Sequence, residues 1–230
     1  MIRSPGRRGS PASGPAGRSE RVSRRKRADR YHHGNLREAL VQEAVRTIRK
    51  RGIERVTLRA VGEALGVSRT ALYRHFVDKS ALLAAVAREG FRTLRLELLD
   101  AWNRGDQGRA GFDAMGLAYI RFAMAHPAHY RVMFGGFVDK ATQDPDLMAE
   151  ASAAFQALVD ALVAQQNAGL VRNDDPLQLA RFVWATVHGV AMLAIDGQLQ
   201  GERGDAESLT RYVSERMHSG ISGRQLSADG

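Results

Sequence analysis

The sequence predicts an all-α fold in which an N-terminal three-helix domain with a helix-turn-helix precedes a larger C-terminal helical domain. The stretch TLRAVGEALGVSRTALYRHF, Thr57 to Phe76, has two short apolar stripes at helical spacing on either side of a glycine corner. Apolar residues then recur at helical spacing through most of residues 81–220. No alternating strand pattern or internal repeat competes with these signals, so every regular element is expected to be a helix.

The first 30 residues differ in composition from the rest of the 230-residue chain. They are mainly Gly, Pro, Ser, Ala and Arg, with ten basic against two acidic residues, a net charge of +8. A segment with so few apolar side chains cannot offset the entropy that is lost on ordering. We therefore expect residues 1–30 to be a disordered basic arm. Its Arg24–Arg27 and Arg30 either enter the minor groove or follow phosphates when DNA is present, or only raise nonspecific affinity.

Residues 31–80 are expected to form the three-helix domain. Its first helix has a capping box, Asn35 with Glu38, and ends at Gly52. An apolar stripe repeats every four residues along this helix and consists of Leu36, Leu40, Ala44 and Ile48. The stripe provides the surface on which the other two helices are expected to pack.

The helix-turn-helix follows from cap and turn residues. Thr57 is expected to cap its first helix and Ser68 its second, because hydroxyl oxygens accept hydrogen bonds from the free N–H groups at a helix start. Gly66 suits the left-handed residue that ends the first helix. Ala60 and Ala64 are expected to be the small residues that let the two helices approach each other.

The second helix, Arg69–His75, separates its side chains by face. Leu72 and Phe76 are four residues apart and are expected in the core. The opposite face then exposes two guanidiniums, a hydroxyl and a phenol, from Arg69, Thr70, Tyr73 and Arg74. Arginine can bond guanine edges or phosphates, hydroxyls can bond phosphate, and the methyl group of Ala71 can meet a thymine methyl. The alternative is an ordinary solvated helix face.

The larger domain, residues 81–220, is expected to hold six helices and to end before a tail at 221–230. Their predicted starts are the cap Asp78, Phe112, Pro127, Pro145, the cap Asp175 and residue 205. A loop is expected at Arg104–Gly111, where three glycines interrupt the pattern. The helix after Asp175 should extend to about Gln200. It is apolar on more than one face, and a helix with two apolar faces needs two partners, which indicates a second subunit.

Two stretches resemble the TetR family of bacterial transcriptional regulators. The frame G-x-x-x-x-T-L-R-x-V-x-x-x-L-G-V-S-x-x-A-L-Y-x-H-F-x-x-K-x-x-L, Gly52 to Leu82 within the run Tyr31–Val86, is similar to the DNA-binding domain of that family. The stretch FVWATVHGVAMLAIDG, Phe182 to Gly197, is similar to a helix with Trp and a His-Gly pair in one subgroup. The resemblance implies a homodimer that binds double-stranded DNA, in most cases as a repressor, and leaves an inverted-repeat operator when a small-molecule effector binds.

The expected DNA-binding residues lie in or beside the helix-turn-helix. They are Thr57, Arg59, Ser68, Arg69, Thr70, Ala71, Tyr73, Arg74, His75 and Lys79. Lys79 stands at a helix start, where its ammonium and the free N–H groups together suit a phosphate. In the larger domain, the resemblance implies an effector cavity. We expect it to include Phe122, Met133, Phe137, Trp184 and His188, with plain core packing as the alternative for each.

Charge and composition also bear on the partners. The formal charge of +9 divides into +8 in residues 1–30, +5 in 31–80 (ten basic, five acidic) and −4 in 81–230 (fourteen basic, eighteen acidic), a distribution typical of a nucleic-acid face. The chain has no cysteine, which excludes disulfides, thiol chemistry and Cys-type zinc sites. Because an apolar leader and a run of eighteen apolar residues are both missing, we expect a cytoplasmic protein that does not enter the membrane.

Two other function classes remain open. One is an enzyme that binds an acidic substrate, but the sequence has no motif such as G-x-S-x-G or H-E-x-x-H, and we expect no catalytic residue and no cofactor. The other is a sequence-indifferent DNA-packaging protein, which the basic arm would suit.

His126 and His129 straddle Pro127 without a convincing carboxylate ligand beside them, so helix-corner packing is expected rather than metal binding.

Overall fold

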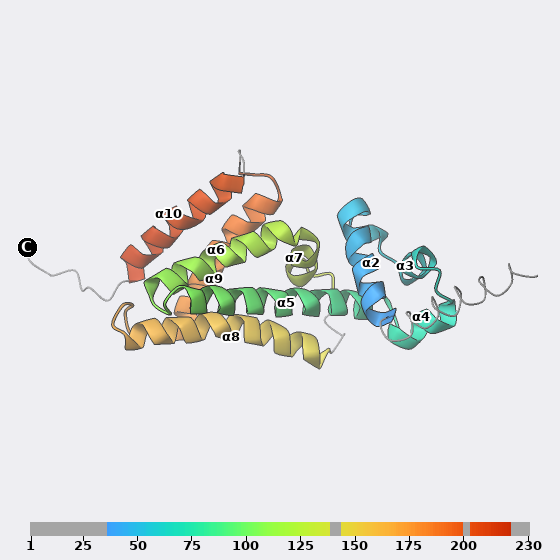
Figure 1. Ribbon diagram of the computed structural model, residues 1–230, viewed down its shortest axis with the longest axis horizontal. Helices are drawn as coiled ribbons and strands as arrows, with labels where there is room; N and C mark the ends of the chain where they lie inside the picture. Colours follow the sequence, from blue (N-terminus) through green and yellow to red (C-terminus); the bar gives the residue numbers. More distant parts are fainter. Residues whose placement is uncertain (1–35, 139–143, 200–202, 222–230) are drawn as a thin grey trace, which may run out of the picture. The chain divides into compact units, whose positions relative to one another are not determined.

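The computed structural model describes residues 36–138, 144–199 and 203–221, and within them every regular element is a helix (Figure 1). The expected all-α fold is therefore confirmed. Nearly all of the described residues belong to one compact unit, Leu40–Gly230. The predictions for the arm at 1–30, for the cap Asn35 and for most of the tail at 221–230 lie outside the described residues.

The N-terminal helices are α2 (Leu36–Arg51), α3 (Leu58–Ala64) and α4 (Arg69–His75), with a short 3-10 helix, η1 (Ile53–Arg55), after α2. Most of the expected stripe of α2 is fully buried, including Leu40, Ala44 and Ile48. Gly52 ends α2 with a φ of +84°, a conformation that favours glycine. The apolar face of α2 is thus buried, as the sequence indicates.

The cap residues fix where α3 and α4 begin. The Thr57 hydroxyl accepts a hydrogen bond from the backbone N–H of Ala60 at 3.1 Å, and the Ser68 hydroxyl accepts one from Ala71 at 3.3 Å. Gly66, between the two helices, has a φ of +65°. Both caps and the glycine corner were predicted from the sequence, and all three are confirmed.

The close approach of α3 to α4 occurs at a residue that the sequence analysis missed. Ala60 and Ala64, the expected small contact residues, are exposed. Gly62 is buried instead, and a Cβ atom at this position would lie 3.2 Å from Cδ2 of Leu72 in α4. Helical spacing explains the correction, because Gly62 follows Leu58 by four residues and so shares its buried face, whereas the two alanines do not.

The larger helical region contains α5 (Lys79–Arg104), α6 (Arg109–Ala125), α7 (Pro127–Phe134), α8 (Pro145–Asn167), α9 (Pro176–Ile195) and α10 (Arg203–Ile221). The long helix α5 packs along α8, α6 and α7 (Figure 1). Helix α9 packs against α6, α8 and α10, and α10 also contacts α6. The core lies between these helices and is built mainly from the apolar faces of α5, α6, α8 and α9.

Two boundaries differ from the prediction. The loop before α6 is only Gly105–Gly108, because Gly111 lies inside the helix, where a Cβ atom would come 2.9 Å from the carbonyl oxygen of Trp102. That glycine permits close packing and does not break the helix. At the other end, α9 stops at Ile195 rather than near Gln200, since Gly197 has a φ of +68° that is typical of a helix terminus.

By length and composition, α8 and α9 could each cross a membrane. The core helices of soluble proteins can be equally long and apolar, and both helices are partly buried inside the protein. Both helices also begin with an aspartate cap, since Asp144 accepts from Leu147 and Asp175 from Leu177. Composition alone is therefore only weak evidence for a membrane segment.

Candidate functional site

The exposed face of α4 is the first candidate site. Leu72 and Phe76 are each 2% exposed, and they hold the helix against the core. The opposite side chains, Arg69, Thr70, Tyr73, Arg74 and His75, are all exposed, and Ala71 is half-buried. The division of α4 into a buried and an exposed face is thus confirmed.

Arg69 and Arg74 are available to an external partner. Neither guanidinium forms an ion pair with any residue that the structure describes. The guanidinium carbon of Arg69 lies 5.6 Å from the centre of the Tyr73 ring, a cation–π distance that orders both side chains on one surface. Two uncompensated cations beside a phenol and a hydroxyl can bond phosphates or the acceptor edges of bases.

Four other expected DNA contacts already have intramolecular partners. The oxygens of Thr57 and Ser68 accept backbone hydrogen bonds, which leaves each hydroxyl proton free to be donated elsewhere. Arg59 donates to Glu63 at 2.7 Å, and this hydrogen bond raises the pKa of the guanidinium. The Lys79 ammonium donates to the carbonyl oxygen of Ile53 at 3.3 Å. These residues surround the α4 face, but their groups are less available than those of Arg69 and Arg74.

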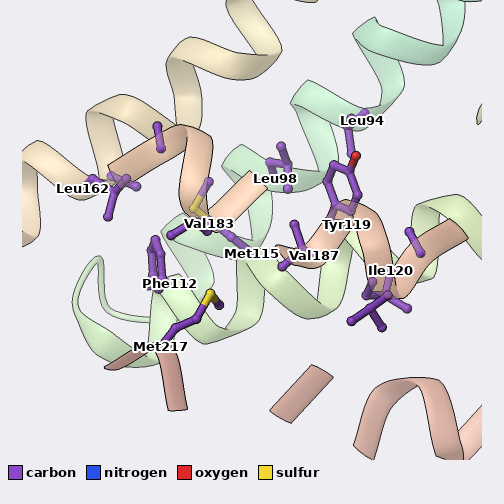
Figure 2. Close-up of a cluster of buried hydrophobic side chains, with 14 of the residues drawn as sticks. Leu94, Leu98, Phe112, Met115, Tyr119, Ile120, Leu162, Val183, Val187 and Met217 are labelled. Atoms are coloured by element: carbon purple, nitrogen blue, oxygen red, sulfur yellow. The ribbon is translucent and has the colours of Figure 1, made fainter. Parts of the chain in front are cut away.

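A cavity of about 460 Å³ lies among α5, α6, α8, α9 and α10, and Phe134 at the end of α7 also lines it. Figure 2 shows part of its wall within a cluster of buried side chains, with labelled wall residues on α5, α6, α9 and α10. The apolar wall residues in that view are Leu94, Leu98, Phe112, Met115, Val183, Val187 and Met217. A space of this size and lining is typical of a site for an apolar small molecule.

One chain of hydrogen bonds links the cavity wall to the core. The indole Nε1 of Trp184 donates to the Tyr119 hydroxyl at 3.2 Å, and this hydroxyl lies 3.0 Å from that of Tyr130. Nδ1 of His188 lies 2.7 Å from the Tyr130 hydroxyl and 3.0 Å from the Tyr119 hydroxyl. Because an indole N–H can only donate, one arrangement that satisfies these contacts has Tyr119 donating to Tyr130 and Tyr130 donating to Nδ1 of His188. In that arrangement the imidazole is neutral and carries its proton on Nε2.

Burial favours the neutral form of every member of this chain. It raises the pKa of Tyr119 to about 12 and also raises the pKa of Tyr130. It lowers the pKa of His188. This hydrogen-bond chain therefore carries no formal charge at neutral pH.

A second polar cluster lies where α2, α5 and α7 meet. The Glu89 carboxylate accepts a hydrogen bond from Nε2 of Gln42 at 2.7 Å and lies 3.6 Å from Nε2 of His129. The contact with His129 is the main cause that lowers the pKa of Glu89. The rings of His126 and His129 are 5.8 Å apart, and the described residues contain no group of three side chains that could hold a metal ion.

Comparison with known proteins decides the family. Residues 40–86 match the family model of the bacterial regulatory proteins of the tetR family, and residues 112–217 match that of the tetracyclin repressor-like C-terminal domain. The HTH-type transcriptional repressor Rv1474c of Mycobacterium tuberculosis is 30% identical over 156 residues, which are 65% of this chain and 76% of that protein. The chain belongs to the TetR family.

Two further relatives of this TetR-family chain are informative. The HTH-type transcriptional repressor AcnR of Corynebacterium efficiens is 42% identical over 55 residues, 24% of this chain and 29% of that protein. A solved structure of a protein with unknown function from Rhodococcus sp. RHA1 has a TM-score of 0.75 and 32% identity, and the match covers 84% of this chain and 98% of that one. The chain is thus a DNA-binding transcriptional regulator with the helical architecture of its family.

Of the five residues that were expected at the effector cavity, the structure places only one in its wall. Trp184 lines it, and His188 lies behind it through the two tyrosines. Phe122 is 1% exposed in the core, Met133 packs against Gly90, and Phe137 is 39% exposed beside Gly135. None of these three is part of the cavity wall.

Sequence reasoning did not identify Tyr119 and Tyr130 as residues of the cavity or of its hydrogen-bond chain. Tyr119 follows Met115 by four residues and Phe112 by seven, so it extends the buried face of α6. A phenol in a buried stripe needs a hydrogen-bond partner, and that requirement was the available signal. The identity of the partner came only from the fold, since His188 is 69 residues away.

Acidification is expected to destabilise this TetR-family protein through His188. Because burial lowers its folded pKa below the ordinary value of 6.5, the unfolded chain binds the proton first as the pH falls. The free energy of unfolding should decrease once the pH drops below about 6.5 and level off below the folded pKa. Urea unfolding at about pH 7.5 and about pH 5.5 measures this decrease.

The matched variants are His188→Asn and His75→Asn, because His75 is exposed on α4. His188→Asn should show a smaller decrease than the wild type, with the remainder due in part to His126, whose pKa is also lowered by burial. His75→Asn should behave like the wild type. An unchanged decrease in His188→Asn would contradict the neutral form of this histidine.

Proposed function

We propose that this regulator is a cytoplasmic homodimeric repressor, not an enzyme, and that a small-molecule effector releases it from DNA. Each subunit places α4 in the major groove of one half of an inverted repeat. The observation that carries the proposal is the exposed α4 face, with Arg69 and Arg74 unpaired among the described residues and Leu72 and Phe76 anchored behind them. A short helix held in this way can enter a groove without losing its own packing.

Within this proposal, the expected contacts have different roles. Arg69 and Arg74 bond base edges or phosphates, and Tyr73 bonds phosphate while it supports Arg69 from below. Thr57, Ser68 and Lys79 stand at helix starts, where they add phosphate contacts that fix the register of the protein on DNA. Thr70, Ala71 and His75 complete the surface, and Arg59 reaches phosphate only if it leaves Glu63.

Replacing Arg69 and Tyr73 together with alanine should abolish specific operator binding. Base-edge and phosphate contacts each contribute about 1–3 kcal/mol, so the loss of two of them should lower affinity for the operator at least about thirtyfold. A gel shift with the promoter of the neighbouring gene measures the loss. Random competitor DNA is present, and the salt concentration is physiological. The variant should remain folded, since both side chains are exposed.

The matched control is Arg92→Ala with Leu96→Ala, which removes an arginine and a large side chain four residues apart on the exposed face of α5. This pair should leave operator affinity unchanged. If the α4 double variant still bound its promoter specifically, the reading face would lie elsewhere on the protein.

The exposed side of α9 supports the homodimer. Phe182 is 49% exposed and Leu193 is 44% exposed, and their separation of eleven residues is close to three helical turns, so both lie on one side. Gly189 lies between them, and a Cβ atom there would have no neighbour within 4 Å. An exposed apolar stripe with a glycine in its middle suits close packing against an identical helix.

Phe182→Glu with Leu193→Glu should convert the dimer to a monomer at micromolar concentration, because four carboxylates would meet across a two-fold interface. Sedimentation velocity measures the mass. The control, Met148→Glu with Leu170→Glu, charges two other exposed apolar residues and should remain dimeric. A dimeric Phe182→Glu, Leu193→Glu variant would rule out this side of α9 as the interface.

Helix α5 offers a route from the cavity to the DNA-binding helices. It contributes Leu94 and Leu98 to the cavity wall, and its Glu89 accepts the hydrogen bond from Gln42 in α2. An effector that fits one position of α5 better than another favours that position, and only such a difference in affinity can move the equilibrium. The proposed repressor leaves DNA when the favoured position spaces the two α4 helices wrongly.

A sequence-indifferent DNA-binding protein is the alternative that uses the same basic surface. It predicts equal affinity for promoter and random DNA at physiological salt, whereas a specific regulator binds its operator about a thousandfold or more tighter. An acidic-substrate enzyme would instead turn over substrate whether or not Arg69 and Tyr73 are present.

A further inference from the structure

The polar groups around the cavity are satisfied by the protein itself, with one exception. Trp184 and Tyr119 belong to the hydrogen-bond chain that ends at His188. The Thr210 hydroxyl donates to the carbonyl oxygen of Ala206 at 2.7 Å, and the Ser214 hydroxyl donates to Asp113. A ligand therefore meets few donors in this cavity that still lack an acceptor.

Arg181 is the exception. It lines the cavity from α9 and is the only charged side chain among the described lining residues. Within the described part of the chain, its guanidinium has no carboxylate within 4.0 Å and no other polar partner. Since Arg181 is itself exposed whereas Tyr119 is 5% exposed, the charge stands at the solvent side of an otherwise apolar space.

We propose that the effector is an amphiphile with a single anionic group, such as a carboxylate, and a flexible or elongated apolar body. The anionic group pairs with Arg181, and the apolar body fills the space between α6, α8 and α10. This inference rests on the proposed function, because it names the chemical class of the effector of that same cavity. The ligand brings the carboxylate that Arg181 lacks and needs no further polar group.

The charge of the lining disfavours a cationic ligand, and its occupied hydrogen-bonding groups disfavour a polyol. An ammonium group would stand beside an unpaired guanidinium with no acidic side chain in the lining to offset the repulsion. A molecule with many hydroxyls would lose its bonds to water and find the internal donors and acceptors already occupied. A guanidinium, by contrast, bonds a carboxylate through two parallel N–H groups.

The shape of the lining favours a long apolar body. Phe91, Leu94 and Leu98 follow one another along α5, and Ala151, Ala154, Phe155 and Leu158 follow one another along α8. Met115 and Met217 add flexible thioether side chains that adapt to different ligand shapes. Affinity should thus grow with the length of the body until the space of about 460 Å³ is full.

The test is a homologous series of straight-chain alkyl carboxylates, titrated into the full-length protein by calorimetry. Affinity should rise about threefold to fourfold for each added methylene and then level off. A primary alcohol and a primary amine of equal chain length serve as the charge controls, and the carboxylate should bind tightest and the amine weakest. A gel shift with the operator follows whether each compound also releases DNA.

The second part of the test uses the variant Arg181→Gln. It should weaken the carboxylate at least about threefold and leave the alcohol within about twofold, so that the two compounds bind alike. Arg92→Gln, an exposed arginine of α5 outside the cavity lining, should keep the wild-type preference. Arg181→Lys retains the charge without the forked geometry and should fall between the wild type and Arg181→Gln.

The outcomes separate this inference from the proposed function. If alcohols bind and release DNA as well as carboxylates do, or if Arg181→Gln keeps the preference, the anionic class is wrong while effector release stands. If carboxylates bind through Arg181 but leave the operator complex intact, the ligand class stands and release by this cavity fails. If no member of the series binds at millimolar concentration, the inference is overturned.

Discussion

The continuity of α5 is the constraint on which the rest of the structure depends. The helix starts at the Asp78 cap, whose carboxylate accepts the N–H of Ala81 at 2.8 Å, and continues without a break to Arg104. Its N-terminal half carries Glu89, the partner of Gln42, and its C-terminal half carries Leu94 and Leu98 of the cavity wall. In the proposed mechanism, a displacement of α5 at the cavity wall also moves Glu89 and with it the contact to α2.

Helices α5 and α7 are closely packed beside Glu89. A Cβ atom at Gly90 would clash with Sδ of Met133 and lie 3.2 Å from Cβ of His129, so α5 and α7 are in tight contact at this point. Glu89 precedes Gly90, and the same turn thus bears on both α7 and α2. Packed elements of this kind have few intermediate arrangements, which is the property that turns a small local shift into a change between discrete positions.

The helix-turn-helix could be predicted from the sequence because its determinants are local. Thr57 and Ser68 cap helices three residues away, Gly66 sets the corner, and Leu72 with Phe76 marks the buried side. The cavity could not be predicted in the same way. Its wall joins Leu94 to Met217 across more than a hundred residues, and local spacing cannot tell a side chain that borders an empty space from one that fills a core.

The errors in the prediction have the same origin. Phe122 and Met133 have the chemistry of cavity residues, but packing against their neighbours puts Phe122 in the core and Met133 beside Gly90. Gly62 and Gly111 were overlooked as contact points because a glycine has no side chain to mark a face, and only the neighbouring helix shows the need for it. The sequence thus determined which helices form, whereas the cavity and the helix contacts depended on long-range packing.

The distance between the two DNA-binding helices of a dimer tests this account most directly. The chain has no cysteine, so Val77→Cys, at an exposed residue just after α4, allows one spin label per subunit. Pulsed electron resonance then gives the distance between labels with operator DNA bound and with a saturating ligand of the cavity. The account predicts a different distance when the ligand is bound; an unchanged distance, although operator affinity falls, would contradict it.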